Sequence, residues 1–278
     1  MPMTAKGFPV MLSFDLDAET MWTARDAANA GRPIVLSQGA YGWKTGMPRI
    51  LALLQRHGIH ATFFVPGLVI EQRPAVIEQI LEQGHELAHH SWSHAWIVNL
   101  TAEEEREEME KGYEIIKRVS GKAPAGYRSP AGEFSPNTLS LLLEYGFSYS
   151  SNYFDTDAPY LHEVDGTLTD LVEFPFAWVL DDAPFFQYSI TLPGRTMQAP
   201  SAVLEAWIAE FDTMYREQGQ FMLAMHPQII GRPSRLQILE KLIEHLQAHD
   251  VWIDRCDRIA EAVRPILRES QTAESDAA

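Results

Sequence analysis

Short apolar segments rich in β-forming residues alternate along this chain with segments of helical periodicity. Strands that are separated by helices pair in parallel, because a parallel connection needs a long crossover. The alternation therefore predicts a parallel sheet or barrel rather than a β-sandwich. We expect strands at residues 10–14, 61–65, 86–90, 126–129, 172–174, 221–225 and 251–254.

The segments between these strands have helical patterns and, in one case, a clear N-terminal cap. Thr101 followed by Glu104 is a capping box, and Gly121 ends the helix that begins there. About seven strands in one continuous alternation, with no Ser/Gly linker, predict a single α/β domain, an irregular (β/α)7-type, TIM-like barrel. The expected helices are 47–56, 74–83, 101–119, 136–145, 202–217, 235–248 and 257–267.

Two segments depart from this alternation. Residues 155–200 are loop-rich and contain five prolines: Pro159, Pro175, Pro184, Pro193 and Pro200. We expect this segment to be an insertion that covers one end of the barrel. Residues 269–278 are small and polar, which predicts a disordered tail after a domain that spans residues 1–268.

The charge and hydropathy of the 278-residue chain exclude several kinds of partner. A formal net charge of -16 argues against binding to nucleic acid phosphates and to anionic membrane surfaces. No stretch approaches the ~18 uninterrupted apolar residues of a membrane span, and the N-terminus lacks the apolar segment of a secretion signal. The expected location is therefore the cytoplasm.

Polar residues cluster at the predicted strand ends. In a β/α barrel the active site lies at the carboxyl ends of the strands, so residues at these ends should share one rim. The residues concerned are Asp15, Asp17, His90, His94, Arg128 and His226. For the two aspartates, a pair of solvated turn residues is the alternative.

His90 and His94 are the strongest metal-binding signal in the sequence. Two imidazoles four residues apart lie on one face of a helical turn, so both can bind one cation. A divalent cation with two nitrogen ligands needs an oxygen donor, and Asp15 or Asp17 is the candidate. Two imidazoles and one carboxylate leave open coordination positions, which is typical of a catalytic metal site. Chance spacing is the alternative, because the chain has 10 histidines.

Arg128 and His226 are candidates for orienting a carboxylate and for proton transfer. An arginine at a strand end pairs bidentately with a carboxylate, and an ordinary surface ion pair is the alternative. A histidine at the mouth of a buried strand suits proton donation near neutral pH, and a core histidine bonded to a backbone carbonyl is the alternative. Asp157, Tyr160 and Trp178 are candidates to line a substrate pocket, with packing inside the loops as the equal alternative.

Four motifs in this order resemble the polysaccharide deacetylase superfamily (NodB homology, carbohydrate esterase family 4) over roughly residues 10–254. The matching motifs are Asp15-Leu16-Asp17, His90-Ser91-Trp92-Ser93-His94, Arg128-Ser129-Pro130 and Leu223-Ala224-Met225-His226. The resemblance implies a divalent metal, often zinc, whose ligands are Asp17, His90 and His94. It also implies that Asp15 is the base, that Arg128 tethers this base and that His226 is the acid.

The spacing of the aspartates is similar to that of one subgroup. The better-studied sugar deacetylases have adjacent aspartates followed by Gly-Pro, whereas Leu16 separates the pair here and Ala18 follows. This form, together with residues 226–233, resembles cyclic imidases, metal-independent allantoinases and an atypical peptidoglycan deacetylase, which often form homotetramers. Because the three implied metal ligands are all present, the metal-dependent branch is the expectation.

The sequence thus predicts a metal-dependent hydrolase of amide bonds, that is, of carbon–nitrogen bonds other than peptide bonds. The missing secretion signal and the long insertion favour a small cyclic imide or ureide as the substrate. Arg232 is a candidate to hold its polar edge, with a surface role as the alternative. N-deacetylation of an aminosugar or a peptidoglycan component is the first alternative function. The others are a two-His-one-carboxylate iron oxygenase, which the β/α alternation disfavours, and a non-catalytic binding protein on the same fold.

Overall fold

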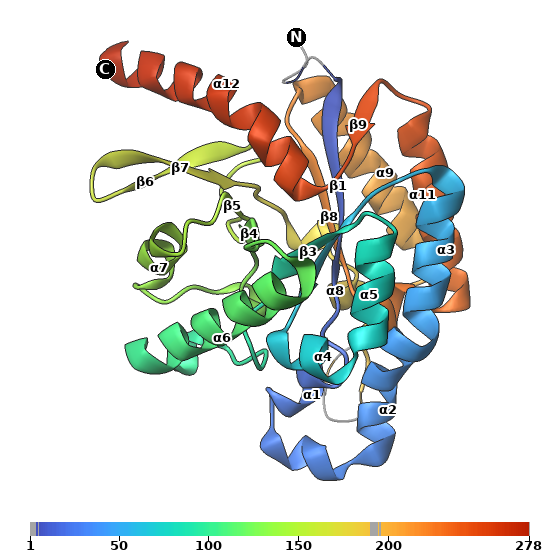
Figure 1. Ribbon diagram of the computed structural model, residues 1–278. Helices are drawn as coiled ribbons and strands as arrows, with labels where there is room; N and C mark the ends of the chain where they lie inside the picture. The colour runs from blue at the N-terminus through green and yellow to red at the C-terminus, as the bar shows by residue number, and fades with distance from the viewer. Residues whose placement is uncertain (1–3, 5, 190–193, 195, 278) are drawn as a thin grey trace.

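β1 (Phe8–Asp15) is the central strand of the fold, and all of its residues are buried. The strand is almost continuously apolar, as expected where both faces of a parallel sheet are covered. The computed structural model describes residues 4, 6–189, 194 and 196–277. Figure 1 shows β1 near the centre of the molecule, with β8 (Phe221–Met225) beside it and helices around the sheet.

β1 is hydrogen-bonded along both of its edges. β8 pairs with residues 10–14 of β1 on one edge. On the other edge, β9 (Val251–Ile253) pairs with the first part of β1, and β2 (Thr62–Val65) pairs with the last part. Beyond β2 the sheet continues through parallel strands and ends in an antiparallel one. These strands are, in order, β3 (Glu86–His89), β4 (Gly126–Tyr127), β5 (Tyr149–Ser150), β7 (Thr167–Glu173) and β6 (Tyr160–Val164).

The prediction of a single α/β domain built on a parallel sheet is confirmed, and every predicted strand is present. β5 and β6 are additional strands. Within the described residues, no ladder joins β8 to the β6–β7 end of the sheet, so hydrogen bonds do not close the barrel. An isolated bridge between Asp181 and Ala224 lies on the otherwise unpaired edge of β8.

The helices predicted from periodicity are also present. They are α3 (Met47–His57), α5 (Pro74–Glu82), α6 (Ala102–Ser120), α7 (Thr138–Glu144), α9 (Pro200–Glu217), α11 (Pro233–Gln247) and α12 (Cys256–Ala277). The capping box of α6 is confirmed, because Thr101 and Glu104 each bind the backbone N–H of the other. Gly121 ends this helix in the left-handed conformation. Among the described residues, no helix is long and apolar enough to cross a membrane.

Several helical elements have no periodic signal in the sequence. Most have only one or two turns, which are too few to show a period, and the longest of them buries too few residues to form an apolar face. The α-helical ones are α1 (Thr20–Thr23), α2 (Pro33–Tyr41), α4 (Gly67–Gln72), α8 (Ala183–Phe186) and α10 (Pro227–Ile230). Single 3₁₀ turns lie at Ala27–Gly31, Ile97–Asn99, Pro130–Gly132 and Trp178–Leu180, and a π-helical turn at Gly42–Gly46 joins α2 to α3. α2 buries only Val35 and Gly39.

The sequence predicts that residues 155–200 cover one end of the barrel, but only part of this segment lies there. β6 and β7 form a hairpin that extends the sheet, and its turn residues Asp165 and Gly166 have φ angles of 51° and 72°. Asp-Gly is a preferred sequence for a tight hairpin turn, so this hairpin is detectable from the sequence. The part after β7 reaches the carboxyl ends of the strands, where Phe176 and Trp178 line a cavity. Pro193 lies outside the described residues.

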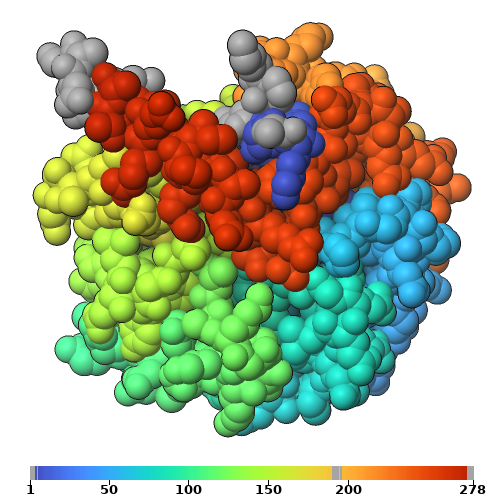
Figure 2. Space-filling model, turned by 45° about the horizontal axis from the view of Figure 1, so that its top comes forward, coloured from blue at the N-terminus to red at the C-terminus, as the bar shows by residue number. Residues whose placement is uncertain are grey.

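α12 continues through the segment for which the sequence predicts disorder. The helix extends to Ala277, and its polar side chains as far as Gln271 bind the edge of the sheet. Gln271 binds both backbone groups of Leu161 in β6, at 2.7 Å from the N–H and 3.1 Å from the carbonyl oxygen. Arg268 binds Asp170 in β7. Figure 2 shows α12, in red, lying across this face of the molecule beside the yellow hairpin.

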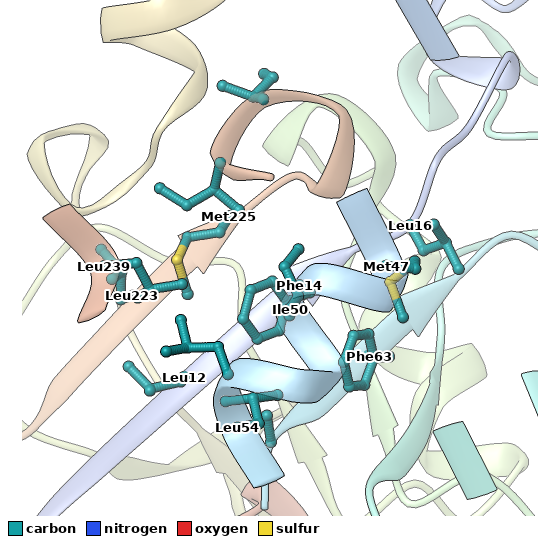
Figure 3. Close-up of a cluster of buried hydrophobic side chains, with 14 of the residues drawn as sticks. Leu12, Phe14, Leu16, Met47, Ile50, Leu54, Phe63, Leu223, Met225 and Leu239 are labelled. Carbon is teal, nitrogen blue, oxygen red and sulfur yellow. The ribbon is translucent and has the colours of Figure 1, made fainter. Parts of the chain in front are cut away.

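A hydrophobic cluster fixes the central strands against α3 and α11 (Figure 3). Phe14 of β1 and Phe63 of β2 stack with their ring centroids 5.1 Å apart, and Ile50 of α3 belongs to the same cluster. Leu223 and Met225 extend the cluster along β8. Side chains of this size each contribute about 1.5–3 kcal/mol when they are buried. This packing therefore fixes the relative positions of the carboxyl ends of these strands.

Glu86 is a buried carboxyl group at the opposite, N-terminal end of the sheet. Its oxygens accept hydrogen bonds from Thr62 Oγ1 at 2.7 Å, Tyr149 Oη at 2.9 Å and the backbone N–H of Asp257 at 3.0 Å. Burial, together with the nearby Asp257 carboxylate, raises the pKa of Glu86 to about 7. The fold therefore favours the protonated form of Glu86.

We expect Glu86→Gln to flatten the pH dependence of stability. A carboxyl group whose pKa is raised by folding stabilises the fold below its unfolded pKa of 4.5, and this contribution is lost as the pH rises through about 7. The lost contribution amounts to about 3 kcal/mol. Urea unfolding between about pH 5 and pH 8 should show this loss in the wild type and not in the variant. The exposed Glu82→Gln is the control, and equal slopes for wild type and Glu86→Gln would contradict the assignment.

Candidate active site

The carboxyl ends of β1, β3, β4 and β8 surround one cavity of about 550 Å³. The polar residues predicted at the strand ends all line it, and all are buried. These residues are Asp15, Asp17, His90, His94, Arg128 and His226. The structure therefore brings the whole predicted set together, and the role of each residue stays a prediction.

Asp17, His90 and His94 converge within this cavity. The Nε2 atoms of His90 and His94 lie 3.4 and 3.5 Å from Asp17 Oδ1. Both carboxylate oxygens of Asp17 are buried and have no hydrogen-bond partner within the part of the chain that the structure describes. Ligands of a tetrahedral zinc ion, about 2.0–2.1 Å from the metal, lie about 3.3–3.5 Å apart. The three side chains therefore fit a divalent cation, which would satisfy the buried carboxylate.

The protonation states in this cluster also suit a metal. Burial alone would raise the pKa of Asp17, but the neighbouring imidazoles of His94, His226 and His90 lower it to about 2. Burial, opposed by the Asp17 carboxylate, lowers the pKa of His94 to about 4. His90 Nδ1 lies 2.7 Å from the Arg128 carbonyl oxygen, to which it donates, so in the neutral tautomer with this hydrogen bond the lone pair is on Nε2. An ionised carboxylate and neutral imidazoles are the forms that bind metals.

The segment from His90 to His94 is not the helical turn that its spacing predicts. It is an irregular loop after β3, and Ser91 and His94 both have left-handed φ angles of 64°. Two backbone N–H groups at the start of α4, those of Gly67 and Leu68, donate to the carbonyl oxygens of Ser91 and Trp92 at 3.0 and 2.8 Å. Contacts with neighbouring elements, rather than helical periodicity, therefore bring the two imidazoles together.

Asp15 forms a buried ion pair with Arg128. Arg128 Nη1 donates to Asp15 Oδ1 over 2.7 Å and to Ser13 Oγ over 2.9 Å. Its other donors bind Ser151, at 2.9 Å to Oγ and 3.3 Å to the carbonyl oxygen. Through these hydrogen bonds the guanidinium holds Asp15 in one orientation beside the cluster of Asp17, His90 and His94, and Asp15 is not a member of that cluster.

His226 has acidic partners that are not among the predicted site residues. Its Nδ1 lies 2.7 Å from Asp182 Oδ1, and its backbone N–H donates to Asp182 Oδ2 over 3.0 Å. Its Nε2 lies 3.8 Å from Asp17 Oδ2. Burial opposes a charge on the ring, but Asp182, Asp181 and Asp17 together raise the pKa of His226 well above its usual range. These carboxylates therefore favour the protonated form of the ring. Two consecutive aspartates flanked by apolar residues are the sequence signal for this partner.

Of the four predicted substrate-binding residues, Trp178 lines the cavity. Its ring stacks on that of Phe154 with the centroids 5.1 Å apart, and about half of its surface is exposed. Phe176 and Trp96 line the same cavity. Trp178 thus belongs to an aromatic wall of the cavity that also contains Asp17, His90 and His94.

The structure does not bring the other three candidates to this cavity. Tyr160 Oη binds the Asp155 carboxylate at 3.2 Å, in an exposed position. The backbone carbonyl of Asp157 accepts a hydrogen bond at the start of β8, at the opposite end from the site. The Arg232 guanidinium lies 3.6 Å from the centroid of the Tyr41 ring and lines a separate pocket.

Comparison with known proteins identifies the relatives of this chain. The family model for polysaccharide deacetylase matches residues 34–150. A peptidoglycan deacetylase from Helicobacter pylori is 33% identical over 271 residues, which cover 88% of this chain and 92% of the relative. The chain belongs to the polysaccharide deacetylase family. The deacetylases of this family hydrolyse carbon–nitrogen bonds other than peptide bonds and use a divalent metal, so the predicted class of hydrolase is confirmed.

Solved structures of polysaccharide deacetylase relatives have the same architecture. A Mycobacterium smegmatis protein assigned to this class is 37% identical and superposes with a TM-score of 0.89, covering 94% of this chain and 91% of that one. The Puue allantoinase superposes with a TM-score of 0.80 at 24% identity, covering 93% and 91%. The allantoinase therefore supports the fold alone, and the first structure supports the family as well.

Proposed function

We propose that this polysaccharide deacetylase relative hydrolyses an amide bond in a small cyclic imide or ureide, with zinc as its divalent metal. The observation that carries the proposal is that one cavity of about 550 Å³ brings together the cluster of Asp17, His90 and His94, the Asp15–Arg128 ion pair and His226. Small-molecule pockets commonly have volumes of about 300–1,000 Å³. A cytoplasmic location belongs to the same proposal, and so does a homotetramer, which the sequence resemblance implies.

The residues of the cavity divide the reaction between them. A divalent cation held by Asp17, His90 and His94 would polarise the substrate carbonyl and lower the pKa of water. Asp15 accepts the proton from the attacking water, and Arg128 keeps its carboxylate turned toward that water. Their buried ion pair of 2.7 Å supports this role, because a base must be held within reach of the proton it removes.

His226 donates a proton to the leaving nitrogen. The surrounding carboxylates favour the protonated form of the ring, which supports the role of acid. Asp182 accepts from Nδ1, which fixes the ring orientation and leaves Nε2 directed into the cavity. Asp15 and His226 thus have opposite tasks, as amide hydrolysis requires.

The walls of the cavity support a small substrate. Large apolar side chains from two separate segments line it, with Trp96 and Val98 following the metal-binding loop and Phe176 and Trp178 following β7. A glycan chain would have to pass the metal on both sides, whereas a single ring fits between such walls. This geometric argument favours a cyclic imide or ureide over a polymer.

N-deacetylation of an aminosugar or a peptidoglycan component is the second candidate. It is favoured by the Helicobacter pylori relative, which is a peptidoglycan deacetylase and aligns with 88% of this chain. An acetamido group would present the same kind of carbonyl to the metal, so the same base and acid would serve. Substrate size separates the two candidates.

We expect the zinc-loaded protein to hydrolyse a small cyclic imide with a higher kcat/KM than an N-acetylglucosamine oligomer. Trp178→Ala should narrow this difference, because it removes a half-exposed wall residue and leaves the proton-transferring groups in place. Tyr160→Phe, outside the cavity, is the control and should leave the ratio unchanged. Faster turnover of the oligomer by the wild type would overturn the small-substrate proposal in favour of the deacetylase. No turnover of either substrate would contradict both.

A further inference from the structure

Glu108 of α6 binds the loop that carries the two histidine ligands. Its Oε2 accepts from the backbone N–H groups of Trp92 and Ser93 at 2.9 and 2.8 Å, and also from Ser91 Oγ. Its Oε1 accepts from Ser93 Oγ at 2.8 Å. One carboxylate therefore binds all three residues between His90 and His94.

This loop holds a conformation that its own sequence does not favour. Ser91 and His94 both lie in the left-handed region, where residues other than glycine are strained. α4 binds the loop carbonyl oxygens, and His89 Nδ1 accepts the Ser91 N–H at 3.1 Å. Glu108 accepts from the next two N–H groups, those of Trp92 and Ser93. The loop thus depends on Glu108 for the acceptor of two successive backbone donors.

The position of Glu108 on α6 distinguishes it from the acidic residues around it. α6 begins with a run of glutamates, a pattern that is typical of a solvent-exposed helix face. Glu105, Glu108, Met109 and Gly112 follow helical spacing, and they turn toward the sheet. Gly112 allows this approach, because a Cβ atom there would lie 2.4 Å from His89 Nε2 and 3.0 Å from the Ser91 carbonyl oxygen. α6 is therefore in direct contact with the segment that bears the ligands.

We propose that Glu108 is a positioning residue that sets the affinity of the site for its metal. It fixes the backbone between His90 and His94, and so it fixes the position of His94 Nε2 relative to the Asp17 carboxylate. Without the carboxylate, the strained loop relaxes and the cation must reorder it on binding. Residues that orient ligands in this way typically change metal affinity about 10–100-fold. The proposal rests on the metal site of the proposed function.

The test is the dissociation constant for Zn²⁺, measured by competition with a chromophoric chelator. We expect Glu108→Ala to weaken binding about 10–100-fold and Glu108→Gln, which keeps one acceptor oxygen, to weaken it less. Glu105→Ala is the matched control. Glu105 is buried on the same helix but binds Ser135 and Thr138 instead of the loop, so this variant should lower the melting temperature and leave the dissociation constant unchanged. The visible spectrum of the Co²⁺-loaded proteins reports the ligand geometry independently of activity.

The outcomes separate this proposal from the one on which it rests. A wild type that binds no metal would overturn the metal site itself. A wild type that binds Zn²⁺ with both Glu108 variants unchanged would overturn the positioning role alone. The positioning role would also be overturned if Glu105→Ala weakened Zn²⁺ binding as much as Glu108→Ala. The loss of affinity would then reflect the lower stability of the whole fold. If Glu108→Ala does not fold, the Glu108→Gln measurement decides.

Discussion

His94→Ala should abolish stoichiometric metal binding while the fold survives. His94 lies in a loop at the rim of the sheet and contributes no side chain to the hydrophobic clusters, so its removal leaves the core intact. The variant loses the imidazole whose Nε2 lies 3.5 Å from Asp17 Oδ1, and two ligands hold a divalent cation poorly. Because orienting residues alone change affinity about 10–100-fold, a direct ligand should change it more than about 100-fold.

Elemental analysis of the purified variant measures this effect, and a thermal melt reports the fold. His57→Ala is the control, because His57 lies at the end of α3 and binds Gln247 outside the cavity. That variant should keep its metal. Stoichiometric metal in His94→Ala would show that the ion binds elsewhere.

Asp15→Asn should keep the metal and lose most of the activity. The amide oxygen can still accept from Arg128, so the local structure is retained, but asparagine cannot take a proton from water. General-base contributions are usually about 10²–10⁴-fold, and we expect a loss of kcat in this range. Steady-state kinetics at full metal loading measures the loss, and elemental analysis verifies that the metal is present.

Ser13→Ala is the matched control for this variant. It removes another acceptor of Arg128 Nη1 and leaves the Asp15 carboxylate in place. A much smaller loss is expected, because the base remains. If the two variants lost activity equally, the orientation of Arg128 rather than the basicity of Asp15 would explain the effect. Near-normal turnover of Asp15→Asn would remove Asp15 from the mechanism.

The strand-end residues were predictable because position and residue type are both local properties. Asp17, Arg128 and His226 each follow an apolar run, and parallel strands bring such ends to one rim. The shape of the metal-binding loop was not predictable, since Ser91 and His94 take left-handed angles only because α4 and α6 hold them there. Tertiary contacts therefore override the helical spacing of the two histidines.

The partners of these residues were harder to predict, because they come from elsewhere in the sequence. Asp182 reaches His226 across 44 residues, by a segment whose bridge to β8 has no pattern in the sequence. Glu108 stands in a run of exposed glutamates, and only the packing of α6 distinguishes it. Arg232 is the opposite case, because it lies close to His226 along the chain and yet lines a separate pocket.

The open edge of the sheet at β8 divides the residues around the cavity into two groups that can change independently in evolution. The metal ligands and the Asp15–Arg128 pair follow strands of one continuous ladder, whereas Asp182 and Trp178 belong to a segment that meets β8 through a single bridge. A segment outside the ladder can change in length and sequence without shifting the register of any strand. Divergence between relatives can therefore remodel the wall at Trp178 while the strand-borne residues and the contact between Asp182 and His226 are kept, so one chemistry can serve substrates of different size.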